Sequence, residues 1–151
     1  MSKQTIFTSL LFMLILMVSC QNQTPSEGDS QAAREAITKV LMDQQVAWNA
    51  GDIPSFMEGY VKNESLSFGG SRGFTVGWQN TLDRYNKSYP DQAAMGQLIF
   101  DIIDLRLLTK DVAVMNGKFT LIRAEDTPSG FFTLVWQKID SQWLIQADHT
   151  C

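Results

Sequence analysis

Apolar residues recur at helical spacing in the first half of the chain and in strand-like runs in the second half. Over 31–50 they repeat with the period of a helix that buries one face. An acidic cap and a proline in the first turn predict a short second helix over 53–60. A third helix is predicted over 78–88, because Pro90 prevents its continuation.

The remaining apolar segments are typical of β-structure. Two short strands, predicted over 64–68 and 74–76, flank a glycine-rich turn. Long strands follow at hairpin spacing over 97–108, 111–124, 131–139 and 142–149. Such spacing predicts an antiparallel meander. Helices that precede most of the strands predict an α+β fold, with three helices on one face of a curved sheet of about six strands.

The N-terminus is patterned differently from the rest of the chain. A basic start, an apolar run over 6–18 and the pair Ser19-Cys20 are typical of a secretory signal peptide. The run is too short to span a membrane. The string ending at Cys20 resembles a bacterial lipobox, with Met17 where leucine is preferred. We therefore predict a signal peptide over 1–19, a lipidated cysteine and flexible tether over 20–30, and one domain over 31–151.

Charge and cysteine content narrow the possible partners. The net charge of −4 and the absence of a basic patch argue against nucleic acid. Contact with the membrane is therefore expected through acyl chains on Cys20. This predicts a cell-envelope protein on the periplasmic face. Gln21 stands where some lipoproteins carry an inner-membrane retention aspartate, which favours the outer membrane if the source is Gram-negative.

Three local strings carry a resemblance to a known superfamily. These are Trp48-Asn-Ala-Gly-Asp52, Gly130-Phe-Phe-Thr-Leu-Val-Trp136 and Trp143-Leu-Ile-Gln-Ala-Asp-His149. With the order of elements, they resemble the nuclear-transport-factor-two-like superfamily, which includes ketosteroid isomerase and the SnoaL polyketide cyclases. The resemblance covers about residues 31–150. It implies a cone-shaped fold with the helices on the concave side of the sheet, an internal pocket and a homodimer paired through the sheet.

One histidine and two aspartates are candidates for acid/base chemistry. His149 is the only histidine, and imidazole titrates near neutral pH. Asp101 and Asp104 lie three apart in an apolar strand, so we expect them to face opposite sides, and one could enter the cavity. There, burial would raise its pKa. The alternatives are a structural histidine at the strand end and aspartates on a solvated face or in salt bridges to Arg106 or Arg123.

Other candidates have side chains suited to a pocket wall. Aromatic rings could line a pocket for a flat apolar ligand, or they could form the core. Two arginines could hold an anionic ligand, or they could make structural ion pairs. The predicted pocket residues are Trp48, Tyr60, Phe68, Arg72, Trp78, Tyr85 and Arg123.

The sequence carries no signature of the common catalytic families. One histidine and no cysteine cluster argue against a transition-metal site, and the sequence contains no nucleotide-binding or nucleophile motif. We expect no metal and no cofactor. The preferred hypothesis is a lipid-anchored domain that binds a small apolar or amphipathic molecule. The alternative is a cofactor-free isomerase, dehydratase or cyclase, although the first helix lacks the tyrosine of ketosteroid isomerases.

Overall fold

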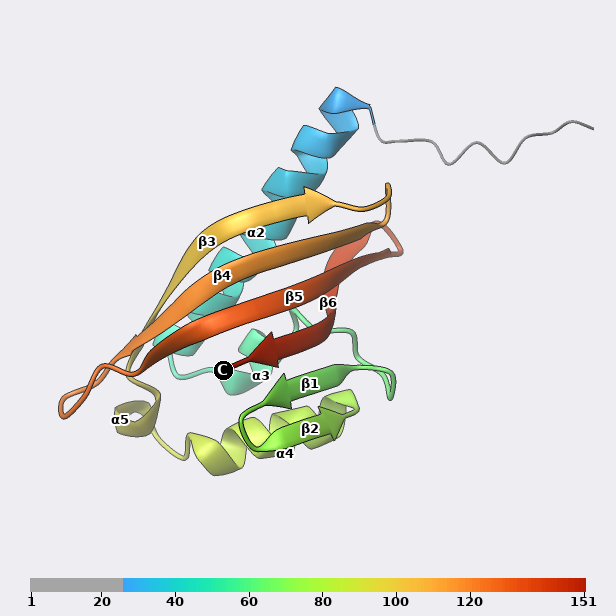
Figure 1. The fold of residues 1–151 in the computed structure, drawn as a ribbon. Coiled ribbons are helices and arrows are strands. Elements are labelled where there is room, and N and C mark those ends of the chain that lie inside the picture. Colours follow the sequence, from blue (N-terminus) through green and yellow to red (C-terminus); the bar gives the residue numbers. More distant parts are fainter. Residues whose placement is uncertain (1–25) are drawn as a thin grey trace, which may run out of the picture.

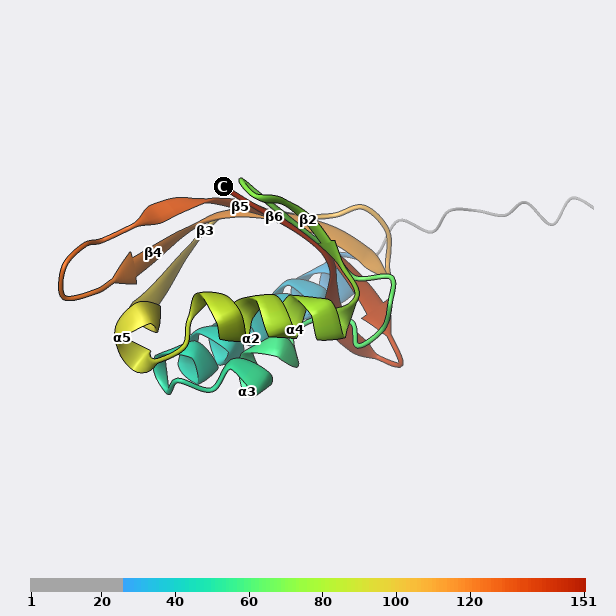
Figure 2. The ribbon, with the colours of Figure 1, turned by 90° about the horizontal axis from the view of Figure 1, so that it is seen from below.

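A curved sheet of six strands arches over a layer of helices (Figures 1 and 2) in the computed structural model, which describes residues 26–151. The predicted signal peptide, Cys20 and the first part of the predicted tether lie outside the described residues. The elements follow the chain as α2 (Glu27–Asn49), α3 (Ile53–Met57), β1 (Ser67–Gly70), β2 (Gly73–Val76), α4 (Trp78–Ser88), α5 (Gln92–Met95), β3 (Gln97–Leu107), β4 (Val112–Ile122), β5 (Ser129–Ile139) and β6 (Gln142–Thr150).

The predicted α+β architecture is confirmed, with the helices on the concave side of the sheet (Figure 2). The strand order is β2-β1-β6-β5-β4-β3. One pairing differs from the prediction of an antiparallel sheet, because β1 runs parallel to β6. Hairpin spacing constrains only strands that follow each other in the chain, and β1 and β6 are the first and last strands.

Three helices differ from the sequence prediction. Helix α3 ends at Met57 and not at residue 60. The first helix begins at Glu27 instead of residue 31, so residues 27–30 are helical and not part of a tether. Ser26 is its cap, with the Ser26 hydroxyl 3.2 Å from the backbone nitrogen of Asp29. The four-residue helix α5 was not predicted. Its cap is Asp91, whose carboxylate accepts from the backbone nitrogen of Ala94 at 2.8 Å.

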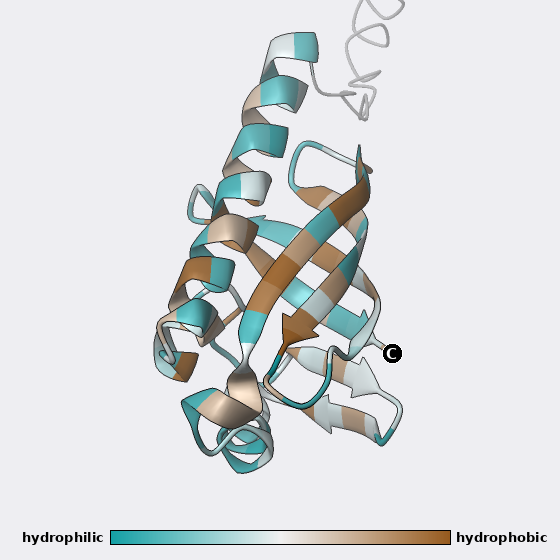
Figure 3. Ribbon diagram, turned by 90° about the vertical axis from the view of Figure 1, so that its left-hand side faces the viewer, coloured by the Kyte–Doolittle hydropathy of each residue, from teal (hydrophilic) through white to brown (hydrophobic). Residues whose placement is uncertain are grey.

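Helix α2 packs its apolar face onto the concave side of the sheet. Ile37, Leu41 and Trp48 are each at most 3% exposed, whereas the opposite face of the helix is polar (Figure 3). None of the helices within residues 26–151 has the length and apolarity needed to cross a membrane.

Polar side chains of α2 also cover the edge of the sheet. The Asn49 amide pairs with both backbone groups of Leu98, at 2.6 Å to its nitrogen and 3.0 Å to its oxygen. The Gln45 carbonyl accepts from the backbone nitrogen of Phe100 at 2.7 Å. Because β3 is an edge strand, these side chains replace the missing neighbouring strand and fix the distance between α2 and the sheet.

Two β-bulges interrupt the long strands. In β3 the partners step from Ile102 to Asp104, which leaves Ile103 without a partner in β4. In β6 they step from Ile145 to Ala147, which leaves Gln146 without a partner in β5. A bulge bends the strand and shifts the alternation of its side chains by one residue. Each bulge therefore changes which residues of its strand face the helices.

Candidate functional site

A pocket of about 130 Å³ lies between the concave face of the sheet and helices α2 and α4. Its volume is close to that of the ~150 Å³ cavities that accept benzene in other proteins. Most of its wall is aliphatic or aromatic. The apolar lining includes Leu41, Phe56, Leu98, Phe100, Leu121, Phe132, Leu134 and Ile145. The pocket is therefore suited to a small apolar body.

A carboxyl group lies in the buried part of this pocket. Asp148 is only 6% exposed and lines the pocket wall. The hydroxyl of Tyr60 donates to Asp148 Oδ2 at 2.8 Å, and the hydroxyl of Thr150 donates to Oδ1 at 2.6 Å. Tyr60 is 3% exposed. Both carboxylate oxygens therefore have a donor, which is what a buried carboxylate requires.

The bulge at Gln146 places Asp148 on the inner face. Trp143 and Ile145 face the core, so strict alternation would continue with residues 147 and 149. The bulge shifts the alternation, and Asp148 lies opposite the buried Leu134 of β5. The strand thereby presents its carboxyl group, and not His149, to the pocket.

Burial raises the pKa of Asp148 from its ordinary value of 3.8 to about 6. The hydrogen bonds from Thr150 and Tyr60, and the charges of His149 and Arg84, oppose this rise. Burial and the neighbouring carboxylate raise the pKa of Tyr60 well above its ordinary value. Near neutral pH the carboxyl can therefore take up or release a proton, while the phenol remains a hydrogen-bond donor.

The predicted acid/base residues lie outside the pocket. His149 is exposed on the opposite face of β6, where its ring lies 6.3 Å from that of Phe74. Asp101 is exposed and lies opposite Lys118 of β4. The expectation that Asp101 and Asp104 face opposite sides was wrong. The bulge at Ile103 turns both to the outer face, where Asp104 pairs with Arg106 at 2.8 Å.

The structure brings together five of the seven predicted pocket residues. The five that line the pocket are Trp48, Tyr60, Phe68, Arg72 and Tyr85. Trp78 instead joins two helices, because its indole Nε1 donates to the carbonyl of Met57 at 2.9 Å. Lys62 covers the Trp78 ring at 4.7 Å, and neither residue lines the pocket.

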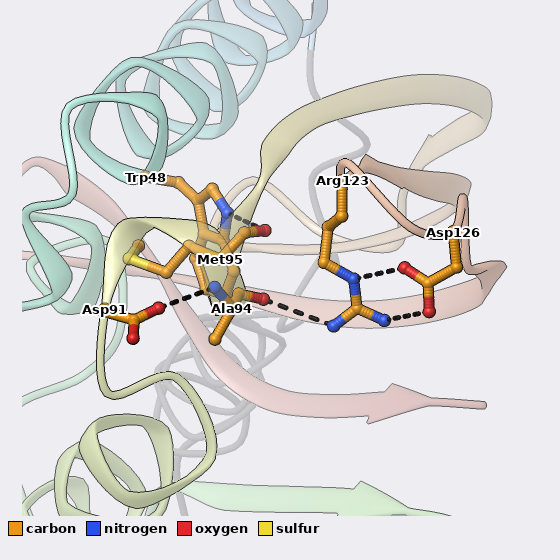
Figure 4. Close-up of polar contacts among 6 residues, drawn as sticks. All are labelled: Trp48, Asp91, Ala94, Met95, Arg123 and Asp126. Atoms are coloured by element: carbon orange, nitrogen blue, oxygen red, sulfur yellow. Dashed lines mark hydrogen bonds and ion pairs between the residues drawn. The ribbon is translucent and has the colours of Figure 1, made fainter.

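Arg123 forms a structural ion pair. This was the alternative to its predicted role in binding an anionic ligand. Its Nε and Nη2 lie 2.6 and 2.8 Å from the two oxygens of Asp126 (Figure 4). Its Nη1 donates to the carbonyl of Ala94 in α5 at 3.3 Å. Arg123 thus ties α5 to the loop between β4 and β5. Next to it, the Trp48 indole donates to the carbonyl of Met95 at 3.2 Å.

Sequence reasoning missed Asp148 and Arg84, which also lines the pocket. Asp148 gave no signal, because alternation from Trp143 and Ile145 assigns it to the outer face. Arg84 gave none either, since a cation on an amphipathic helix usually faces solvent. Within residues 26–151, no cluster of histidine, cysteine or acidic residues could hold a metal ion.

Several solved structures have folds similar to that of this chain. An NTF-2-like protein of unknown function from Shewanella oneidensis shares 40% identity at a TM-score of 0.76, covering 78% of this chain and 98% of that one. LinA shares 18% identity at a TM-score of 0.68, and the match covers 84% of this chain and 90% of LinA. A ketosteroid isomerase-like protein from Erwinia carotovora shares 15% identity at a TM-score of 0.60, and the match covers 77% of this chain and 92% of that protein. No protein-family model and no curated protein matches the sequence.

Because the carboxyl of Asp148 is buried, we predict that the stability of the folded domain depends on pH. Folding raises the pKa of Asp148, so the folded state binds its proton more tightly than the unfolded chain does. This contribution is fully present below about pH 4 and is lost as the pH rises through 6, with a size on the order of 3 kcal/mol. Asp148→Asn removes the titration. We therefore expect the free energy of unfolding of Asp148→Asn, minus that of wild type, to rise by that amount between pH 4 and pH 7. Urea titrations at both pH values measure this difference.

The matched control is Asp101→Asn, the same change on the outer face. Its free energy of unfolding should follow the wild-type pH profile. Parallel profiles for Asp148→Asn and wild type would contradict the assignment of a raised pKa to Asp148.

Proposed function

Because this chain belongs to the nuclear-transport-factor-2-like (NTF2-like) superfamily, we propose that it is a lipid-anchored domain that binds a small apolar or amphipathic molecule in its pocket. The observation that carries the proposal is the pocket itself. Apolar residues from α2, β3, β4, β5 and β6 line a pocket of about 130 Å³ that is partly open to solvent. These side chains leave the space between helices and sheet unfilled, whereas a protein core is normally close-packed.

The chemistry of the wall supports a ligand with an apolar body. Apolar surface predominates, and the few polar groups lie at defined positions, as in most small-molecule sites. The rings of Trp48, Phe56 and Tyr85 contact one another edge to face, with centroids 5.2 to 6.0 Å apart. Rigid aromatic walls of this kind bury a ligand with little loss of side-chain entropy.

Filling the pocket should abolish binding. Benzyl alcohol is a suitable neutral probe, and its addition should shift amide resonances of pocket residues in ¹H–¹⁵N NMR spectra. Leu121 is 4% exposed and lines the pocket, so Leu121→Trp should remove these shifts. The matched control is Leu108→Trp, because Leu108 is 59% exposed and lies outside the pocket lining. Wild-type spectra unchanged by any such probe would contradict the proposal.

A second function, acid/base catalysis without a cofactor, is favoured by one observation. The carboxyl of Asp148 has a pKa of about 6 and shares a hydrogen bond with the Tyr60 phenol inside an apolar pocket. A carboxylate next to a phenol donor can remove a proton from carbon and stabilise the resulting enolate oxygen. The tyrosine that the first helix lacks is thus supplied by Tyr60, just after α3.

Proton transfer can be tested without knowledge of the natural substrate. Cyclohexanone in D₂O should exchange its α-hydrogens faster with the wild-type protein than with buffer, as followed by ¹H NMR. Asp148→Asn should lower this exchange by about 10²-fold or more, the usual contribution of a general base. Asp101→Asn, the control on the outer face, should keep the wild-type rate. Equal rates for wild type and Asp148→Asn would leave only the binding function.

The lipid anchor and the homodimer are proposals of the same kind. The lipobox-like string ending at Cys20 supports the anchor, and exposed apolar side chains on the outer face of the sheet, among them Ile103 and Phe131, support pairing of two copies. Intact mass spectrometry of the membrane fraction should show loss of residues 1–19 and acyl chains on Cys20. Cys20→Ala should remain uncut and unacylated, whereas Cys151→Ala should match wild type.

The homodimer is tested by light scattering on the domain without its acyl chains. A measured mass of two chains is expected, and a mass of one chain would contradict the dimer.

A further inference from the structure

Two arginine side chains line the pocket and have only neutral partners among the described residues. Arg84 comes from α4, and its Nη1 donates to the hydroxyl of Thr75 at 2.9 Å. Arg72 comes from the turn between β1 and β2, and its Nη2 lies 3.2 Å from the hydroxyl of Ser88. Within residues 26–151 neither guanidinium forms an ion pair.

Two of the three arginines outside the pocket lining contrast with this pair. Arg106 pairs with Asp104 at 2.8 Å, and Arg123 pairs with Asp126 at 2.6 Å. The third, Arg34, donates to the carbonyl of Leu105. The chain carries more acidic than basic residues, with a net charge of −4, so carboxylates are plentiful. The two guanidiniums that reach the pocket wall are nevertheless left without one. A ligand that carries its own anion would supply the missing partner.

The local geometry favours such an anion at this end of the pocket. The Arg84 guanidinium lies 4.7 Å above the ring of Phe68, which also lines the pocket and limits its motion. Arg84 is half-buried and Arg72 is exposed, so the charge lies at the solvent-facing end. Guanidinium forks bind carboxylates through two parallel hydrogen bonds, which strengthens and orients the contact.

Asp148 limits the ligand to one negative charge. It is buried in the wall of the same pocket, with both oxygens already accepting from Tyr60 and Thr150. The charge of Arg84 opposes the rise in the pKa of Asp148, so the carboxyl lies within electrostatic range of this arginine. The Asp148 carboxylate would repel a second anion, and most of the remaining wall is apolar. The pocket thus combines two cations with one buried carboxyl group in a mainly apolar wall.

We propose that the pocket takes a small monocarboxylate with an apolar body, whose carboxylate is held by Arg72 and Arg84 and whose body lies against the apolar wall. This inference rests on the proposed binding function and specifies the class of its ligand. It applies equally to a bound metabolite and to a substrate, because it concerns the group that anchors the molecule and not the reaction.

Phenylacetate and phenylacetamide provide a matched pair of probes, because they share one body and differ in charge. Their dissociation constants can be measured by NMR titration at low salt. Phenylacetate should bind wild type about tenfold tighter or more, as expected for charge-assisted hydrogen bonds. Arg72→Gln and Arg84→Gln should each reduce this ratio, and the double variant should bring it close to one. Arg106→Gln, the control on the outer face, should keep the wild-type ratio.

A measurement on the wild-type protein alone covers the case in which an arginine variant does not fold. Raising sodium chloride from about 20 to about 500 mM should weaken phenylacetate binding and leave phenylacetamide binding unchanged, because salt screens only the charged contact. Equal affinities for the two probes, or a ratio that the arginine substitutions do not change, would overturn the inference and leave the binding function intact. Failure of benzyl alcohol and of both these probes to bind would instead overturn the proposed function.

Discussion

The β-bulge at Gln146 is the constraint on which the site depends. A regular β6 would turn His149 to the helices and Asp148 to the solvent. With the bulge, Asp148 lies opposite Leu134 on the inner face and accepts from Tyr60 and Thr150. The bulge at Ile103 has the converse effect in β3, where Asp104 joins Asp101 on the outer face. The two bulges together give the concave face one carboxyl group in an otherwise apolar surface.

The helices turn this curved surface into a pocket. Asn49 and Gln45 bind the backbone of the edge strand β3, which sets the height of α2 above the sheet. The ion pair of Arg123 with Asp126 and its contact with Ala94 hold α5 at the end of β3 and β4. These contacts lie at the rim, so the space under the arch stays open while its edges are fixed. Polar groups therefore define the shape of the pocket, and apolar groups define its wall.

A buried carboxyl in this position opposes folding near neutral pH. Burial raises its pKa to about 6, so the deprotonated form is less stable inside the domain than in water. An aliphatic residue in its place would pack against Leu134 without this penalty. Titratable groups shifted in this way are found mainly at functional sites. Arg72 and Arg84, which have only neutral partners among the described residues, give the same pocket a second polar feature of opposite charge.

The sequence by itself determined the elements and the superfamily. Helical periodicity located α4 at 78–88, the hairpin spacing located the four long strands within a few residues, and the strings around Trp48 and Trp143 indicated the NTF2-like fold. These features are local, because caps, turns and periodicity act between residues close in the chain. Tertiary structure decided which side chains meet. A bulge depends on the pairing of β6 with β5, and the pocket depends on helices crossing a sheet whose first and last strands lie side by side. The alternation rule alone therefore could not assign Asp148 to the pocket or His149 to the outer face.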